Sequence, residues 1–87
     1  MENTTLTSQQ VWDISNSMSK DLKVELVKDH PEVNKYEIRY FVDNYLNTRI
    51  RAIVCTLTNT AYEDIVEVVH DKLNLDDLFD NRQEYLN

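Results

Sequence analysis

The chain has 87 residues, a formal net charge of −7 and no glycine. Its length is that of a single domain, and its 41% of hydrophobic residues is typical of a folded chain. The absence of glycine disfavours tight hairpins and excludes the glycine-rich loops that bind nucleotides. The single cysteine, Cys55, cannot form an internal disulfide, and no apolar run is long enough for a membrane span, so we expect a cytoplasmic protein.

The first predicted helix covers residues 8–28 and follows residues 1–6, which we expect to be loose. Thr7 and Gln10 have the spacing of a capping box, in which each residue satisfies a backbone N–H of the other. Apolar residues then recur every three or four positions, which predicts one buried stripe along the helix. The stripe consists of Val11, Ile14, Met18, Leu22 and Leu26.

The longest run of apolar periodicity follows Pro31 and covers residues 32–58. Tyr36 to Val42 alternate briefly as a strand would, but Phe41 breaks the alternation, whereas a helical period fits the whole run. Pro31 suits the first position of a helix, where its missing N–H costs nothing. The sequence therefore predicts one long helix that begins near Pro31.

Several large apolar residues lie outside the predicted stripes. In the first helix they are Trp12, Val24 and Val27, and in the second they are Tyr36 and Val54. Such residues are covered by another element or are available to a partner, and Trp is a frequent anchor in protein interfaces.

A third helix is predicted over residues 61–73, with a capping box formed by Thr60 and Glu63. Asn74 is expected to end this helix, because asparagine is second only to glycine in how readily it adopts the left-handed backbone conformation. A short amphipathic stretch follows and predicts one more helix near the C-terminus, on the apolar residues Leu78, Phe79, Tyr85 and Leu86 with Arg82 among them.

These elements predict a single all-α domain over residues 1–87, in which two long helices form an antiparallel hairpin, a third helix packs on it and a short helix ends the chain. The alternative is an α+β fold with a small antiparallel sheet of residues 23–27, 36–42 and 49–56. The predicted core comprises the first-helix stripe together with Ile38, Val42, Leu46, Ile53, Leu57, Ile65 and Val69.

Negative charge is concentrated in the last third of the chain, where residues 59–87 carry eight acids and two bases. This pattern is typical of a solvated face or of a surface that docks a basic partner. One form of such a docking surface imitates the phosphates of nucleic acid. The candidate partner-binding residues are Trp12, Glu63, Glu67, Asp71, Asp76, Asp77 and Asp80.

No residue pattern predicts an enzyme, a cofactor or a metal site. Glu67 and His70 have the Glu-x-x-His spacing of di-metal helical bundles, but those sites need two such pairs and further glutamates. No residue near Cys55 in the sequence would activate its thiol as a nucleophile, and neither His30 nor His70 can be placed beside it from the sequence.

Direct nucleic-acid binding is disfavoured, because a helix-turn-helix protein needs a basic recognition helix and residues 61–73 are acidic. The long helix carries Lys35, Arg39, Arg49 and Arg51, which point in several directions on a helical projection.

Three functions fit the sequence. The first is a small helical protein-interaction module that associates with itself, for example as a homodimer, and acts as an adaptor or inhibitor of a protein partner. The second is an acidic inhibitor, of the type that phages and mobile elements carry, which imitates nucleic acid to block a DNA- or RNA-binding protein. The third is a small nucleic-acid-binding regulator that uses the Arg-bearing helix.

Overall fold

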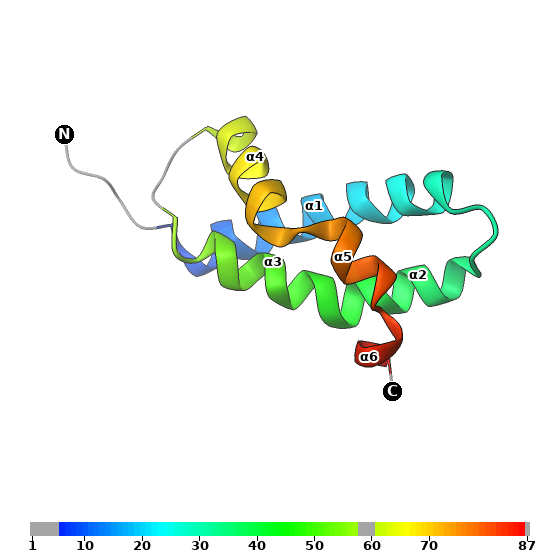
Figure 1. Ribbon diagram of the computed structural model, residues 1–87. Helices are drawn as coiled ribbons and strands as arrows, with labels where there is room; N and C mark the ends of the chain where they lie inside the picture. The colour runs from blue at the N-terminus through cyan, green and yellow to red at the C-terminus, as the bar shows by residue number, and fades with distance from the viewer. Residues whose placement is uncertain (1–5, 58–60, 87) are drawn as a thin grey trace.

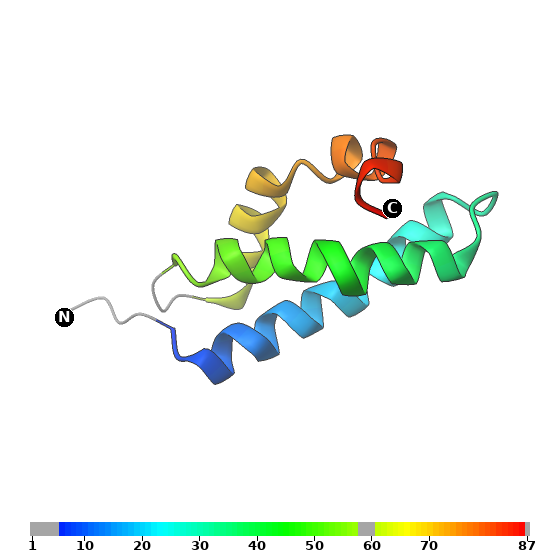
Figure 2. The same cartoon turned by 90° about the horizontal axis from the view of Figure 1, so that it is seen from below.

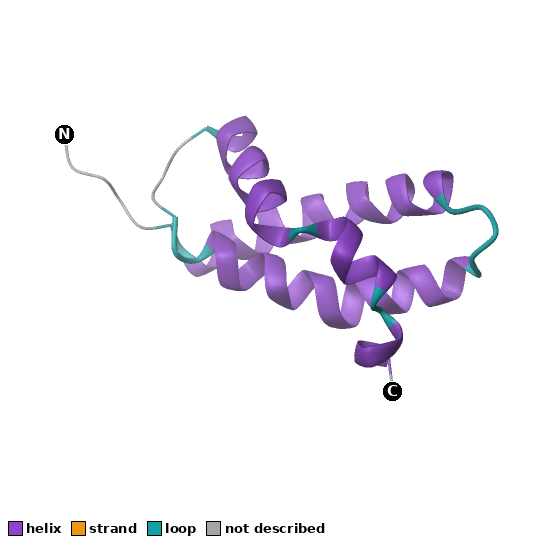
Figure 3. Ribbon diagram, in the orientation of Figure 1, coloured by secondary structure: helices purple, strands orange, loops and turns teal. Residues whose placement is uncertain are grey.

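The computed structural model describes residues 6–57 and 61–86, and these residues form helices without any strand (Figures 1 and 3). The predicted all-α fold is therefore confirmed, and the alternative with a small sheet is wrong. No helix in the described ranges is long and apolar enough to cross a membrane. The elements in chain order are α1 (Ser8–Asp29), α2 (Lys35–Phe41), the π-helical segment η1 (Val42–Leu46), α3 (Asn47–Val54), α4 (Tyr62–Leu73), α5 (Leu75–Asp80) and α6 (Gln83–Leu86).

Helix α1 and the continuous rod α2–η1–α3 form an antiparallel hairpin (Figure 2). The predicted capping box begins α1, since Thr7 Oγ1 accepts from Gln10 N at 3.1 Å and Gln10 Oε1 accepts from Thr7 N at 2.8 Å. Leu6, which the sequence analysis places in the loose lead, is buried. Helices α4, α5 and α6 follow on one side of the hairpin, and the whole measures 49 × 23 × 20 Å.

The rod begins four residues later than predicted, because Asn34 and not Pro31 provides the helix start. Asn34 Oδ1 accepts from Tyr36 N at 2.7 Å and satisfies one of the free N–H groups of the first turn. Pro31 lies instead in the turn between the helices, which is closed by a hydrogen bond of 3.1 Å from Val33 N to His30 O. The rod ends at Val54, and the predicted last residue, Thr58, lies outside the described residues.

The middle turn of the rod, η1, is π-helical rather than α-helical. Hydrogen bonds from residue i to i+5 place more residues in this turn, so side chains beyond it are rotated relative to those of a regular helix. As a result Ile50 and Val54 are fully buried, whereas Ile53 and Leu57 are only partly buried. The assignment of Val54 to the outside of the apolar arc is therefore wrong.

Asn74 ends α4 as predicted and has a left-handed backbone, with φ 53° and ψ 60°. The same residue begins α5, and its Nδ2 donates to Asp77 Oδ2 at 2.7 Å. Helix α4 begins after Ala61, which makes no side-chain cap hydrogen bond, while Thr60 of the predicted capping box lies outside the described residues.

The predicted C-terminal helix is divided into α5 and α6 by a turn at Asn81 and Arg82. Asn81 Nδ2 donates to the carbonyl oxygen of Asp77 at 2.9 Å, and such side-chain bonds compete with helix continuation.

The core lies between the hairpin and the C-terminal helices. Of the predicted core residues, eight are buried, and Val11, Ile14, Ile53 and Leu57 are partly buried and pack against them. Phe41 and Phe79 meet edge to face at a centroid distance of 5.8 Å, which joins α2 to α5. The buried apolar residues are Leu6, Met18, Leu22, Leu26, Ile38, Phe41, Val42, Leu46, Ile50, Val54, Ile65, Val69, Leu73, Leu78 and Phe79.

Candidate protein-interaction site

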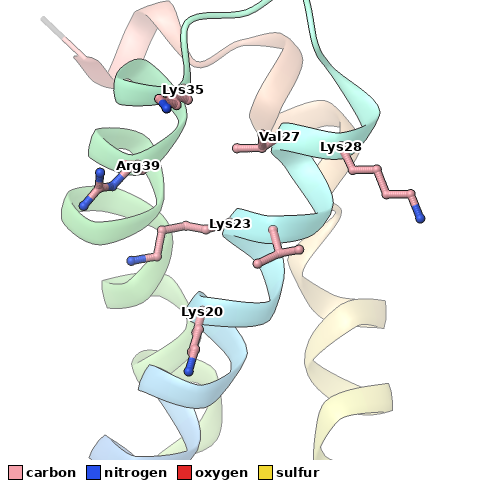
Figure 4. A pocket seen from close by; sticks show the side chains of 7 residues that line it. Lys20, Lys23, Val27, Lys28, Lys35 and Arg39 are labelled. Carbon is pink, nitrogen blue, oxygen red and sulfur yellow. The ribbon is translucent and has the colours of Figure 1, made fainter.

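An open groove with a volume of about 490 Å³ lies between α1 and α2 near the hairpin turn (Figure 4). Its apolar part is formed by Val24, which is 65% exposed, and Val27, which is 38% exposed. All of its lining residues belong to α1 and α2, so α4, α5 and α6 leave it open. We call this surface the α1–α2 groove, and it is lined by Lys20, Lys23, Val24, Val27, Lys28, Lys35 and Arg39.

The groove exists because α1 has two different faces. Lys20, Val24, Val27 and Lys28 recur at three and four residues and share one face of the helix. The buried stripe, which includes Leu22 and Leu26, lies on another face. The apolar residues of the groove are thus additional to those that the core requires.

Five cations surround the two valines, and two of them come from the second helix of the hairpin. Lys23 extends from α1 toward α2 and pairs with Asp43 Oδ1 at 2.9 Å, whereas Lys28 points away from α2 (Figure 4). Lys35 and Arg39 are four residues apart on α2, and each lies 6.0 Å from the ring of the exposed Tyr36. This concentration of like charge favours an anionic partner.

Val24, Val27 and Tyr36 lie outside the predicted apolar stripes and could be identified from the sequence as possible partner contacts, whereas the basic groove could not. On a projection of the second helix alone, its four basic residues point in several directions, and the lysines of the first helix are not seen beside Lys35 and Arg39. The hairpin folds back at residues 30–34, so residues about equally distant from this turn lie side by side. That pairing across the turn was the signal in the sequence that could have revealed the groove.

Trp12, a predicted partner anchor, is 50% exposed and lies near the start of α1. The Arg51 guanidinium lies 4.4 Å from the centre of its ring, a cation–π contact that covers part of the indole. Trp12 also lines a hollow of about 190 Å³ together with Leu6, Ser8, Val11 and Cys55. None of the acidic candidate residues lines this hollow, so Trp12 and the acidic residues do not form one site.

The acidic candidates are exposed on two consecutive helices. Glu63, Glu67 and Asp71 are four residues apart and form a row along α4. Asp76, Asp77 and Asp80 lie on α5, beyond the Asn74 turn. Among the described residues none of the six takes part in an ion pair. Their charge is therefore not neutralised within the fold.

A smaller hollow of about 110 Å³ separates α1 from α4 and brings titratable groups together. Asp21 and Glu25 of α1 face Tyr62 and His70 of α4 across it. Partial burial, and secondly the charge of Asp21, raise the pKa of the Tyr62 hydroxyl above its ordinary value of 10.0. This contact is part of the packing between the two helices.

The structure does not bring the cysteine and the two histidines together. Cys55 Sγ donates to the carbonyl oxygen of Ala52 at 3.2 Å, and the His30 ring lies 4.4 Å from that of Phe79. His70 lines the hollow between α1 and α4, and Glu67 of the Glu-x-x-His pair is exposed. In residues 6–57 and 61–86 no group of three or more His, Cys, Asp or Glu side chains could hold a metal ion.

Comparison of the chain with protein-family models, with curated proteins and with solved structures gave no match. We therefore infer function from the exposed groove and the charged surfaces of this chain.

Proposed function

We propose that this protein is a non-catalytic helical interaction module that binds a protein partner through the α1–α2 groove. The single observation that supports this function is the exposure of Val24 and Val27 at the floor of an open groove. Contiguous exposed apolar surface with a polar rim is typical of protein-interaction sites. An amphipathic helix in such a groove would bury its apolar side on the valines.

The rim of the groove specifies the chemistry of the partner. Lys20, Lys28, Lys35 and Arg39 would pair with carboxylates that flank the apolar stripe of the partner. A protein partner fits the groove better than nucleic acid, because aliphatic side chains form its floor and the net charge of −7 repels phosphates. Binding by such a module would allow it to act as an adaptor or as an inhibitor of the partner.

The test is affinity capture from an extract of the source organism with wild-type protein and with the double variant Val24→Glu/Val27→Glu. Proteins that bind the groove should be retained by the wild type and lost with the variant, because two carboxylates would occupy the apolar floor. Ala52→Glu is the matched control, since Ala52 is exposed on α3 and does not line the groove. Circular dichroism verifies that all three proteins fold. Equal retention by the three proteins would contradict the proposal.

A second candidate function, inhibition of a nucleic-acid-binding protein by mimicry, is supported by the unpaired carboxylate row on α4. Glu63, Glu67 and Asp71 follow one another at intervals of about 6 Å along the helix axis. This interval is within a factor of two of the distance between successive phosphates along one DNA strand. Reversal of these three charges to lysine should abolish such inhibition. Inhibition that persists in the triple variant would exclude this function.

A further inference from the structure

The α1–α2 groove and the acidic row of α4 are complementary surfaces on one chain. Of the five groove cations only Lys23 has an ion-pair partner among the described residues, namely Asp43. Helix α4 presents Glu63, Glu67 and Asp71, which have none. We infer that a second copy of this chain inserts its α4 into the groove. This inference rests on the proposed function and names the partner.

The spacing of the charges on the two surfaces matches. Lys20 and Lys28 are eight residues apart on α1, and Glu63 and Asp71 are eight residues apart on α4, so both pairs span about 12 Å along a helix. Helix α4 has 12 residues and is therefore long enough to reach along the groove. Each carboxylate of the row can then lie near a lysine or near Arg39.

Helix α4 also supplies an apolar contact for the two valines. Val68 is only half-buried, and it lies on the same side of α4 as Asp64 and Asp71, from which it is separated by four and three residues. A helix that docks by this side would place Val68 toward Val24 and Val27, with Asp64 one turn before it and Asp71 one turn after it along the helix. This arrangement is the pattern expected for a helix bound in a basic groove.

A two-fold contact of groove against groove is unfavourable, because it would bring the five cations of each copy together. The contact of α4 with the groove is instead heterologous: the groove of one copy and α4 of the other remain free in a pair. Such a contact continues into a ring or an open chain. The interaction is mainly between exposed charges, so it should weaken as salt concentration rises.

The test uses two variants that each remove one surface. Lys20→Ala/Lys28→Ala removes two groove cations, and Glu67→Ala/Asp71→Ala removes two carboxylates of α4. All four side chains are exposed, and alanine favours a helix, so both variants should fold. Arg49→Ala and Glu84→Ala are the controls, because these exposed charges lie on α3 and α6 and belong to neither surface.

Sedimentation equilibrium at low salt should show that wild-type protein associates with increasing concentration. Each double variant should weaken this association about tenfold, and the controls should leave it within about twofold. An equimolar mixture of the two double variants should form a one-to-one complex that does not grow further. That result is specific for a heterologous contact, since the mixture contains one intact groove and one intact α4.

Three results would overturn the inference. Wild-type protein that remains a single chain at every concentration would do so, as would a mixture of the variants that fails to associate. The third result concerns binding of a fluorescent oligothymidylate. If wild-type protein binds it while remaining a single chain, and Lys20→Ala/Lys28→Ala does not bind it, then nucleic acid is the occupant of the groove. In each case the capture experiment with Val24→Glu/Val27→Glu still tests the groove independently.

Discussion

Three small polar side chains lie inside the otherwise apolar contact between α1 and α3. Ser15, Ser19 and Asn47 are all buried, and Asn47 Nδ2 donates to Ser19 Oγ at 2.7 Å. The Asn47 Oδ1 accepts from Arg51, which itself lies over the ring of Trp12. Ser15 Oγ, in contrast, has no hydrogen-bond partner among the described residues. The two serines therefore contribute differently to stability.

Substitution of Asn47 by alanine should lower the free energy of unfolding by about 2 kcal/mol, because it leaves the Ser19 hydroxyl buried without its partner and opens a small cavity. Ser15→Ala is the matched variant and should be neutral or stabilising by up to about 1 kcal/mol, since it removes an unpaired buried hydroxyl. Urea unfolding measures both. Equal destabilisation by the two variants would contradict this account of the network.

Titration of Tyr62 provides a second test at the level of single residues. Partial burial and Asp21 raise its pKa above 10.0, so the folded state favours the neutral hydroxyl. The resulting stabilisation is fully present below pH 10 and is lost as the pH rises through the folded pKa. Ultraviolet absorbance of tyrosinate should show that Tyr62→Phe removes a late-titrating group and that Asp21→Asn lowers its pKa. An alkaline titration that is unchanged by Asp21→Asn would refute the role of that carboxylate.

The elements show which parts of the fold can be predicted from the sequence. Helix α1 and Asn74 could be predicted, because a capping box and a left-handed asparagine in a glycine-free chain are local signals. The π turn η1 could not, since it depends on how the rod packs and not on a local residue pattern. In an α-helix, four-residue steps drift by about 40°, yet Val42, Leu46, Ile50 and Val54 are all buried at steps of four. The extra residue in the π turn offsets part of this drift.

The start of the rod provides a prediction at the level of the element. Asn34→Ala should lower the free energy of unfolding by about 1 kcal/mol, because the Tyr36 N–H loses its acceptor. Asn34→Asp is the control that keeps a side-chain oxygen as the acceptor at this position and should have little effect. Pro31→Ala should also have little effect if Pro31 is only a turn residue. Thermal unfolding measures the stability of all three variants. A larger loss of stability for Pro31→Ala than for Asn34→Ala would indicate that the helix begins near Pro31, as the sequence predicts.

At the level of the whole molecule, Arg82 attaches the C-terminal helices to the hairpin. Its Nε donates to Glu37 Oε2 at 2.5 Å, its Nη1 donates to the carbonyl oxygen of Phe79 at 3.0 Å, and its guanidinium lies 4.3 Å from the Phe79 ring. Gln83 Nε2 donates to the same Glu37 oxygen at 3.2 Å. The side chains of Arg82 and Glu37 are only 20% and 30% exposed, so water screens this pair less than a surface ion pair.

A double-mutant cycle of Arg82→Ala and Glu37→Ala should give a coupling free energy of about 1 kcal/mol. The same cycle on Lys23 and Asp43, a more exposed pair, is the comparison and should give about 0.3 kcal/mol. Chemical unfolding of the four proteins in each cycle measures the coupling. The reverse order of the two values would show that burial does not govern the strength of these pairs.

The distribution of charge over the molecule was predictable only in part. The acidity of the last third could be counted directly, and the structure leaves Glu63, Glu67 and Asp71 exposed. The basic groove was missed, because Lys20 and Lys28 precede the hairpin turn and Lys35 and Arg39 follow it. Their proximity depends on the register of two packed helices, which a single sequence does not contain.

Asn74 also limits how the length of the chain can vary. Because this one residue ends α4 and begins α5, there is no spacer to absorb an insertion between the two helices. One residue added within α4 would rotate everything beyond it by about 100° and advance it by about 1.5 Å. Phe79 would then leave its place against Phe41, and Arg82 would leave Glu37. Related chains that keep this fold should therefore differ in length elsewhere and have a constant number of residues between Tyr62 and Phe79.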